Sequence, residues 1–208
     1  MKSKDWWSTI VKNMLLDDSK AKNLSLDDKI INQISDNIFE EFSKATYWKK
    51  YDNCDLILNE LNKKNIKLGV ISNFDERLFE IMKNLNINSY FDFVCIPSNS
   101  NGYYKPHHEI FKIAREQAKI DKDSFIIHIG DDFDLDYKAS LNSNSNFKSI
   151  LLLNEDHDKN KYNQLINNNN NNNNDNNKQK KDKDLVRIDK NDIVFNLKQL
   201  LEIILLKY

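Results

Sequence analysis

The sequence predicts an α/β fold: a doubly wound, mostly parallel Rossmann-like sheet with a helical cap. Two observations lead to this prediction. From Asp55 to Leu153 the hydrophobic pattern switches repeatedly between helical and strand periods, which is typical of βαβ units. Residues 125–136 form an apolar run that stops at a glycine and is followed by several carboxylates. A buried parallel strand delivers ligands to its carboxyl edge in this way.

The chain divides into four predicted segments. Residues 1–48 are expected to form the helical cap, and residues 49–153 the α/β core. Residues 154–183 contain an unbroken run of asparagines and too little apolar surface to offset the entropy of ordering, so we expect a disordered insertion. Residues 184–208 then supply a strand and a helix that complete the core.

Apolar side chains in the cap recur at helical spacing on two broad faces. They are Trp6, Trp7, Ile10, Val11, Met14 and Leu15 on one face, and Ile30, Ile31, Ile34, Ile38, Phe39 and Phe42 on the other. The segment from Ser25 to Asp28 resembles a capped helix start, with an acidic residue in place of the usual Glu or Gln. We expect the Trp6–Trp7 pair to lie in the core and not to form a ligand platform.

Helices and strands alternate along the predicted core, with short connections. Helices over 56–64, 77–85, 108–118 and 137–141 precede strands over 67–72, 91–96, 125–129 and 148–153, respectively. Beyond the insertion, 184–188 is predicted to be an edge strand and 193–206 an amphipathic helix. We expect the strands that end at Ser72 and Gly130 to belong to one sheet.

Composition argues against several classes of partner. A formal net charge of −1 gives no electrostatic case for binding nucleic acid or an anionic membrane. No apolar run approaches the roughly 20 residues that span a bilayer, and no targeting pattern is recognised, so a soluble cytosolic or nuclear protein is expected. Cys54 and Cys95 are far apart in the chain, and we expect both to be reduced, small buried residues.

Three segments carry residues suited to phosphate chemistry. Asp131 and Asp136 are spaced so that a loop could aim both at one Mg²⁺ ion, although an acidic solvated turn has the same pattern. Ser72 and Asn73 follow an apolar strand, where a hydroxyl and an amide can donate hydrogen bonds to a phosphate. Lys105 stands directly before a proline, which favours an extended residue at the end of a loop ahead of a helix.

In this order the segments resemble the haloacid dehalogenase-like hydrolase superfamily, whose second, third and fourth motifs are a strand-terminal Ser/Thr, a Lys and a strand-terminal acidic loop. The resemblance covers roughly residues 5–153 and a C-terminal piece. It is closest to the subfamily called haloacid dehalogenase-like hydrolase domain-containing protein 3, through Val-Ile-Ser-Asn-Phe-Asp, Tyr-Phe-Asp-Phe-Val, Lys-Pro and Gly-Asp-x-x-x-x-Asp.

The resemblance implies a Mg²⁺-dependent phosphatase type of hydrolase that acts on a small phosphorylated substrate. Ser72 and Asn73 would bind phosphoryl oxygens, and the catalytic Lys105 would stabilise charge. Asp131 and Asp136 would hold the metal. The true haloacid dehalogenases need no Mg²⁺ and lack this pair of carboxylates, so the pair favours the phosphatase type.

One motif of the family is absent from the sequence. The family begins with a strand that ends in Asp-x-Asp-x-Thr and supplies the nucleophile and the general acid/base. No apolar strand followed by Asp-x-Asp is found before residue 66, and Asp5 follows no strand. In the family this strand is central, and about ten ladder hydrogen bonds depend on it. We therefore expect no appreciable phosphatase activity from the chain as given, and weak or absent Mg²⁺ binding.

Three interpretations remain open at this point. The chain is an N-terminally incomplete hydrolase, a non-catalytic relative that acts as a binding or regulatory protein, or an enzyme with another nucleophile or a partner-supplied strand. Among other polar residues, His128 is expected to be buried and hydrogen-bonded, and His107 and His108 to be solvated or capping. Asp132 is expected to face solvent or to support the metal ligands.

Overall fold

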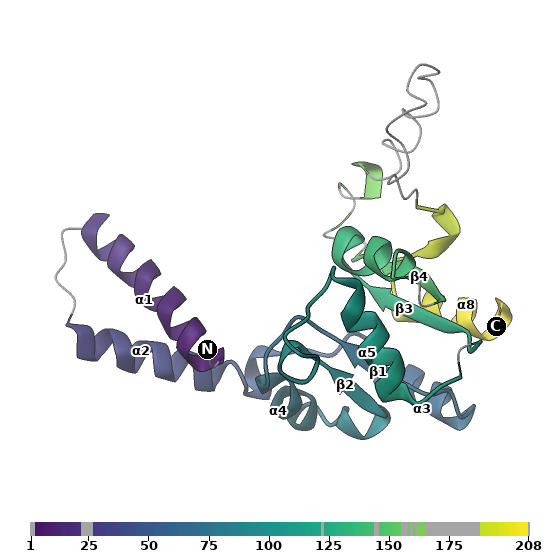
Figure 1. Ribbon diagram of the computed structural model, residues 1–208, viewed down its shortest axis with the longest axis horizontal. Helices are drawn as coiled ribbons and strands as arrows, with labels where there is room; N and C mark the ends of the chain where they lie inside the picture. Colours follow the sequence, from purple (N-terminus) through teal and green to yellow (C-terminus); the bar gives the residue numbers. More distant parts are fainter. Residues whose placement is uncertain are drawn as a thin grey trace, which may run out of the picture. The chain divides into compact units, whose positions relative to one another are not determined.

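The computed structural model describes most of the predicted cap and core (Figure 1). The described residues are 3–21, 27–121, 123–143, 146–154, 158, 160, 162–164 and 188–207. Most of the predicted insertion at 154–183 lies outside them. The described residues fall into two compact units, of which unit 1 comprises Met1–Lys50 and Asn73–Phe91, and unit 2 comprises Tyr51–Ser72 and Asp92–Tyr208.

Unit 1 is built on a hairpin of two long helices. Helix α1 spans Ser3–Ala21 and packs against α2, Asp28–Glu41 (Figure 1). The side chain of Asp27 accepts a hydrogen bond from the backbone N–H of Lys29 at 2.7 Å and so caps α2. Ser25, where a cap was expected, lies outside the described residues. The shorter elements of unit 1 are η1, Ala45–Tyr47, α4, Arg77–Asn84, and η2, Asn88–Tyr90.

The hairpin buries a narrower stripe than the sequence predicts. Val11 and Ile31 are buried, and the Trp7 ring lies 5.6 Å from the Phe42 ring, but Trp6 is 52% exposed and Met14 is 66% exposed. The prediction of a core position is therefore wrong for Trp6. Two packed helices cover only the facing stripe of each, which leaves the margins of a broad apolar face open.

Arg77 ties the start of α4 to the helical hairpin. It is only 7% exposed, and its guanidinium donates to both carboxylate oxygens of Asp75, at 2.8 and 2.6 Å. The guanidinium also donates to the Phe39 carbonyl at 3.2 Å and lies 4.0 Å from the centre of the Phe39 ring. Because Phe39 belongs to α2, one side chain joins α2 to the segment after Asn73.

The described residues of unit 2 form five short strands, and every pairing among them is parallel. Strand β1, Gly69–Ile71, pairs with β2, Phe93–Cys95. Strand β4, Phe147–Leu152, lies between β3, Ile126–Gly130, and β5, Ile193–Val194. The α/β class and the parallel arrangement are as predicted.

The strands do not form the single sheet that was expected. β1 and β2 make a two-stranded sheet, whereas β3, β4 and β5 make a three-stranded sheet. Within the described part of the chain, β1 is hydrogen-bonded only to β2, and β3 only to β4. The expectation that the strands ending at Ser72 and Gly130 share a sheet is therefore wrong, because no described segment forms a ladder with both.

Helix α5, His108–Ala118, links the two sheets by side-chain packing. It packs on β1 and β2, and its fully buried Phe111 lies 5.6 Å, ring to ring, from Phe147 of β4. Cys95 of β2 and Ala139 belong to the same apolar cluster. Buried apolar contact thus holds together two sheets that share no ladder.

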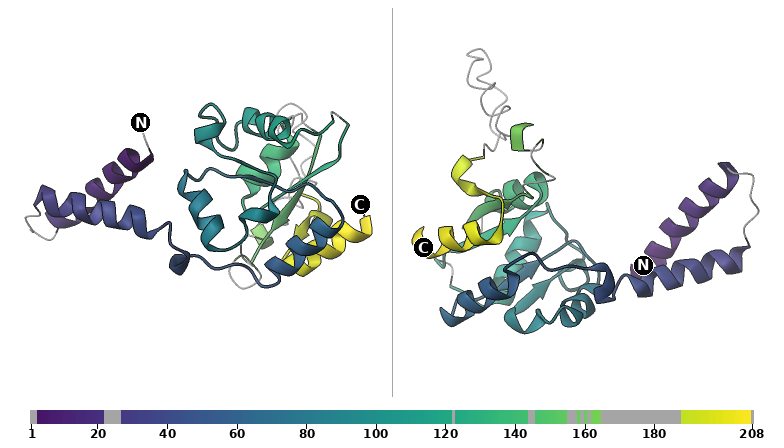
Figure 2. Two further views of the ribbon diagram at one scale, coloured as in Figure 1. Left: turned by 90° about the horizontal axis from the view of Figure 1, so that it is seen from below. Right: turned by 180° about the vertical axis from the view of Figure 1, so that it is seen from behind.

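Helices α3, Cys54–Lys63, and α8, Leu197–Lys207, lie side by side on the three-stranded sheet (Figure 2). Both contribute buried side chains to one apolar cluster with β4 and β5. The members of this cluster are Ile57, Leu61, Ile150, Val194, Leu200 and Ile204. None of the helices in the described ranges has the length and apolar character that crossing a bilayer requires.

The C-terminal elements differ from the prediction in position. Residues 184–187 lie outside the described residues, and the observed strand is β5 at Ile193–Val194, where the sequence predicts the beginning of a helix. The helix begins at Leu197 because the Asn196 side chain accepts the Gln199 N–H at 2.9 Å. The helix start was therefore predicted four residues too early.

The two cysteines have different environments. Cys95 is fully buried and Cys54 is half-buried, and neither forms a disulfide. Burial raises the pKa of the Cys95 thiol to about 11, so this thiol stays protonated at neutral pH. The prediction of a small buried residue is confirmed for Cys95 and is wrong for Cys54, which stands at the start of α3.

Candidate active site

The loop after β3 is ordered by its own carboxylates. Asp132 is half-buried, and its Oδ1 accepts the backbone N–H groups of Asp134 and Leu135 at 2.9 and 2.8 Å. This cap starts a π-helix, Phe133–Lys138, that continues into α6, Ala139–Leu141. The helix predicted to begin at Tyr137 therefore begins earlier, because Asp132 satisfies the N–H groups at its start.

Gly130 allows the π-helix to approach the end of β3 closely. A Cβ atom at this position would lie 2.1 Å from the Asp136 carboxyl carbon, which is an impossible contact. Only glycine therefore permits the observed position of Asp136. The first and last residues of the pattern Gly-Asp-x-x-x-x-Asp are therefore the two that meet in this close approach.

The Asp136 carboxylate is the centre of a buried polar cluster. The side chain of Asp136 is almost fully buried, and its Oδ1 accepts a hydrogen bond from the Lys105 ammonium at 2.5 Å. The same oxygen lies 2.9 Å from His128 Nε2. The other oxygen, Oδ2, accepts the Asp132 backbone N–H at 3.2 Å. Three donors from three segments thus converge on one carboxylate.

These donors decide the charge of Asp136. Burial alone would raise the pKa of the carboxyl group, but the hydrogen bond from His128 and the charge of Lys105 outweigh burial and lower the pKa to about 2. The carboxylate is therefore ionised at neutral pH. With a Lys105 side chain that is only 12% exposed, it forms a buried ion pair.

The remaining predicted site residues lie at the ends of strands. Ser72 directly follows β1, is half-buried, and donates its backbone N–H to the Cys95 carbonyl at 3.0 Å. Asn73 is exposed and belongs to unit 1. Asp131 is exposed and directly follows β3. Direct contact joins Lys105 to Asp136, and Asp131 lies in the turn between β3 and the π-helix that carries Asp136.

The acidic residues supply the kind of ligand that Mg²⁺ prefers but not a full set. Asp131 and Asp136 offer carboxylate oxygens, which suit a hard cation. However, Oδ1 of Asp136 already accepts two donors. Within the described ranges, no group of three or more His, Cys, Asp or Glu side chains is arranged to hold a metal ion. The described residues therefore do not complete a Mg²⁺ site.

Sequence reasoning missed the partner of His128. The prediction of a buried, hydrogen-bonded histidine is confirmed, since His128 is 8% exposed and contacts Asp136. The sequence does contain a signal for this contact. Residues i and i+2 of a strand face the same side, so His128 shares a face with Gly130, the point at which Asp136 approaches. His107 caps α5 by accepting the Glu109 N–H at 3.2 Å, which fits its predicted capping role.

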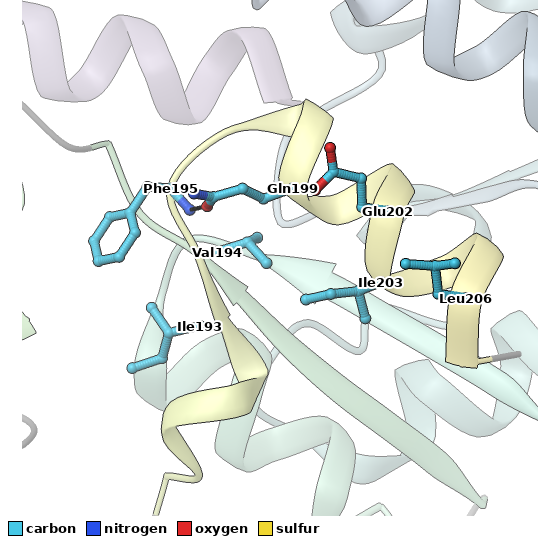
Figure 3. A pocket seen from close by; sticks show the side chains of 7 residues that line it. All are labelled: Ile193, Val194, Phe195, Gln199, Glu202, Ile203 and Leu206. Carbon is cyan, nitrogen blue, oxygen red and sulfur yellow. Dashed lines mark hydrogen bonds between the residues drawn. The ribbon is translucent and has the colours of Figure 1, made fainter.

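A hollow of about 370 Å³ lies between β5 and α8 and contains none of the predicted site residues (Figure 3). Its walls are mainly apolar, with Gln199 and Glu202 as the polar members. The side chain of Gln199 accepts the backbone N–H of Phe195 at 2.8 Å. The lining has one carboxylate, that of Glu202, but no lysine or histidine of the kind that surrounds Asp136.

Comparison with known proteins identifies the class. The sequence profile of the family described as Haloacid dehalogenase-like hydrolase matches residues 11–150, which is more than half of the chain. The chain therefore belongs to the haloacid dehalogenase-like hydrolases, as its motifs predict. The matched segment contains Ser72, Lys105, Asp131 and Asp136.

Within this family the chain is similar to Haloacid dehalogenase-like hydrolase domain-containing protein 3. It is 30% identical to the Mus musculus protein over 138 residues, which are 66% of this chain and 52% of that protein. The Xenopus laevis protein is 31% identical over 140 residues, 67% of this chain and 54% of that protein. The chain thus spans about half the length of the curated relatives that it matches.

A solved structure shows the same fold. The Bacillus subtilis protein YfnB, a putative hydrolase of this superfamily whose structure is described as bound to magnesium, superposes with a TM-score of 0.61 at 15% identity. The alignment covers 98% of this chain and 72% of that chain. At this identity the match supports the fold alone.

Proposed function

We propose that the chain carries part of the active site of a Mg²⁺-dependent phosphatase and, as 208 residues, does not turn over phosphate esters. The observation that supports this proposal is the Lys105–Asp136 ion pair at the end of β3. It joins the third and fourth motifs of the family in one buried cluster.

Each predicted site residue has a role in this proposal. Ser72 and Asn73 bind phosphoryl oxygens through a hydroxyl and an amide. Lys105 stabilises the charge of the phosphoryl group. Asp131 and Asp136 are the carboxylates of the metal site, and because the described residues do not complete that site, Mg²⁺ binds weakly or not at all. The substrate class is a small phosphorylated molecule, and the expected location is the cytosol or the nucleus.

Phosphoryl transfer in the family needs the two aspartates of an Asp-x-Asp-x-Thr pattern, and this pattern follows no strand in the described part of the chain. Phosphoryl transfer in the family begins with attack by an aspartate, and a second aspartate protonates the leaving group. Asp136 is not a substitute, because it is buried and both of its oxygens accept hydrogen bonds. A carboxylate held in this way is a poor nucleophile.

Binding of inorganic phosphate tests the part of the site that is present. We expect weak binding to the chain, detected by NMR titration, and loss of that binding in Lys105→Gln, which keeps most of the length of the side chain but removes the charge. Lys112→Gln, which removes the same positive charge from an exposed position on α5, is the matched control. Equal phosphate binding by the Lys105→Gln variant would contradict the proposed role.

A second function, that of a non-catalytic binding or regulatory protein, is favoured by one observation. Lys105 is already paired with Asp136, so the cluster is stable without a phosphoryl group. In this case Lys105→Gln would leave inorganic phosphate binding unchanged and would only weaken the fold. The titration therefore separates the two functions.

A further inference from the structure

His128 is fixed in position by packing. It lies in the middle of β3, is 8% exposed, and its ring stands edge-on to Phe111 of α5 with ring centres 5.2 Å apart. The ring is also edge-on to Phe147 of β4, at 6.3 Å. A ring held by a strand and by two neighbouring aromatic side chains has little freedom to move.

The direction of the hydrogen bond between His128 and Asp136 follows from the Lys105 ammonium, which donates to the same carboxylate oxygen at 2.5 Å and so pairs with an ionised carboxylate. An ionised carboxylate can only accept, so His128 Nε2 carries the hydrogen and donates it to Asp136 Oδ1 across 2.9 Å. Oδ2 is fixed by the Asp132 N–H. Donors on both oxygens set the rotation of the carboxylate, and Oδ1 is thereby directed at Lys105 as well.

We propose that His128 is a positioning residue, which holds Asp136 so that Asp136 in turn holds the Lys105 ammonium at the carboxyl edge of the sheet. This inference rests on the proposed function, because it assigns the position of Lys105 a use in phosphate binding. Lys105 sits on a loop and has a long, flexible stem, so its ammonium needs a fixed acceptor. His128 supplies that fixed reference from the rigid strand.

A purely structural role of His128 predicts a different result for the Lys105 ammonium. In that case His128 would satisfy the buried Asp136 carboxylate, and its removal would lower stability without changing where the Lys105 ammonium lies. The two roles are separated by variants that keep or remove the donor at the Nε2 position. Gln at position 128 can place an amide N–H near that position, whereas the shorter Asn cannot reach it and Phe has no donor.

The test uses the full chain and two measurements. The first is the ¹H–¹⁵N NMR signal of the Lys105 ammonium, which slow exchange within a buried ion pair makes observable. The second is titration with inorganic phosphate. We expect His128→Gln to keep the Lys105 signal and the phosphate affinity. We expect His128→Asn and His128→Phe to lose the signal and to bind phosphate about tenfold more weakly.

Ile127→Val is the control, because it loosens the packing on the opposite face of β3 and leaves His128 and its aromatic neighbours unchanged; it should keep the Lys105 signal. Circular dichroism checks that each variant folds. If His128→Phe does not fold, the comparison of Gln with Asn decides. The proposal would be overturned by a folded Asn or Phe variant with the wild-type Lys105 signal, or by equal losses in the Gln and Asn variants.

Failure of the proposed function gives a different result. If the wild-type chain binds no inorganic phosphate, the phosphate-binding role of Lys105 fails. The Lys105 ammonium signal still shows whether His128 positions the ion pair. The two hypotheses therefore fail separately.

Discussion

Asp136 makes the stability of the chain sensitive to acid. Its pKa is about 2 in the folded protein and about 3.8 ordinarily, so folding favours the ionised form. A lowered pKa contributes stability that is fully present above about pH 4 and is lost as the pH falls toward 2. The contribution is on the order of 2 kcal/mol.

We predict that Asp136→Asn removes this dependence. The difference in the free energy of unfolding between wild type and variant should shrink by roughly 2 kcal/mol as the pH falls from 4 to 2. Urea denaturation at several pH values measures it. A difference that stays constant over this range would mean that the carboxylate is not held ionised by its neighbours. Asp134→Asn, on the exposed side of the π-helix, is the control and should follow the wild-type curve.

Gly130→Ala tests the close approach of the π-helix to β3. We expect a loss of about 1–3 kcal/mol in the free energy of unfolding, because the added Cβ collides with Asp136. The stability of this variant should also lose its dependence on acid, because the carboxylate is displaced from its donors. Gly102→Ala is the comparison: Gly102 has a φ of +81°, and a Cβ atom there would meet no other atom within 4 Å, so that variant is strained but leaves Asp136 alone. Identical pH profiles for the two variants would argue against the collision.

At this scale the sequence predicts candidate site residues but not the contacts between them. Lys105 and Asp136 are both predicted, and the structure joins them directly. Their contact is not predicted, because it depends on a loop and a π-helix whose geometry has no periodic signal. The Asp136 partner of His128 is missed for the same reason. Which residue contacts His128 depends on where the π-helix returns to β3, although the alternation of side chains along the strand indicates the correct face.

At the scale of elements, Arg77 stabilises the packing of α4 against α2 in unit 1. It pairs with Asp75 and packs against Phe39, so both its charge and its flat guanidinium are used. Arg77→Lys keeps the charge but cannot form the paired hydrogen bonds or stack as a plane. We expect a loss of about 2–4 kcal/mol in the free energy of unfolding, measured by urea denaturation.

Lys83→Arg is the matched control for the Arg77 prediction. Lys83 lies on the same helix, α4, but is exposed, and its replacement should change stability by less than about 0.5 kcal/mol. If Arg77→Lys were as mild as this control, the contacts of the guanidinium with Phe39 would not hold the segment to α2.

The sequence predicts elements well where periodicity and caps agree. Helix His108–Ala118 matches its predicted bounds, because His107 caps it and its buried face is regular. The helix at the C-terminus is misplaced, because the β-branched pair Ile193–Val194 fits a helical face and a strand equally well. Only pairing with Leu151 and Leu152 decides between them, and that pairing is a long-range contact.

At the scale of the whole molecule, the division of the strands into two sheets is the main departure from the expected fold. Parallel strands are normally buried on both faces, yet His128 is the one buried residue of β3 and the other four are half-buried. The family's central strand would lie between β1 and β3, and within the described ranges no strand pairs there. Under the proposed function, the lack of an Asp-x-Asp-x-Thr strand in the 208 residues accounts for both the divided sheet and the lack of turnover.

The most direct test is hydrolysis of a generic phosphate ester with Mg²⁺, comparing this chain with a version that carries an added N-terminal strand ending in Asp-x-Asp-x-Thr. We predict no turnover by the 208 residues and turnover by the extended version, lost again on Asp131→Ala. Turnover by the 208 residues alone that disappears on Asp131→Ala would contradict the account and show that another group is the nucleophile.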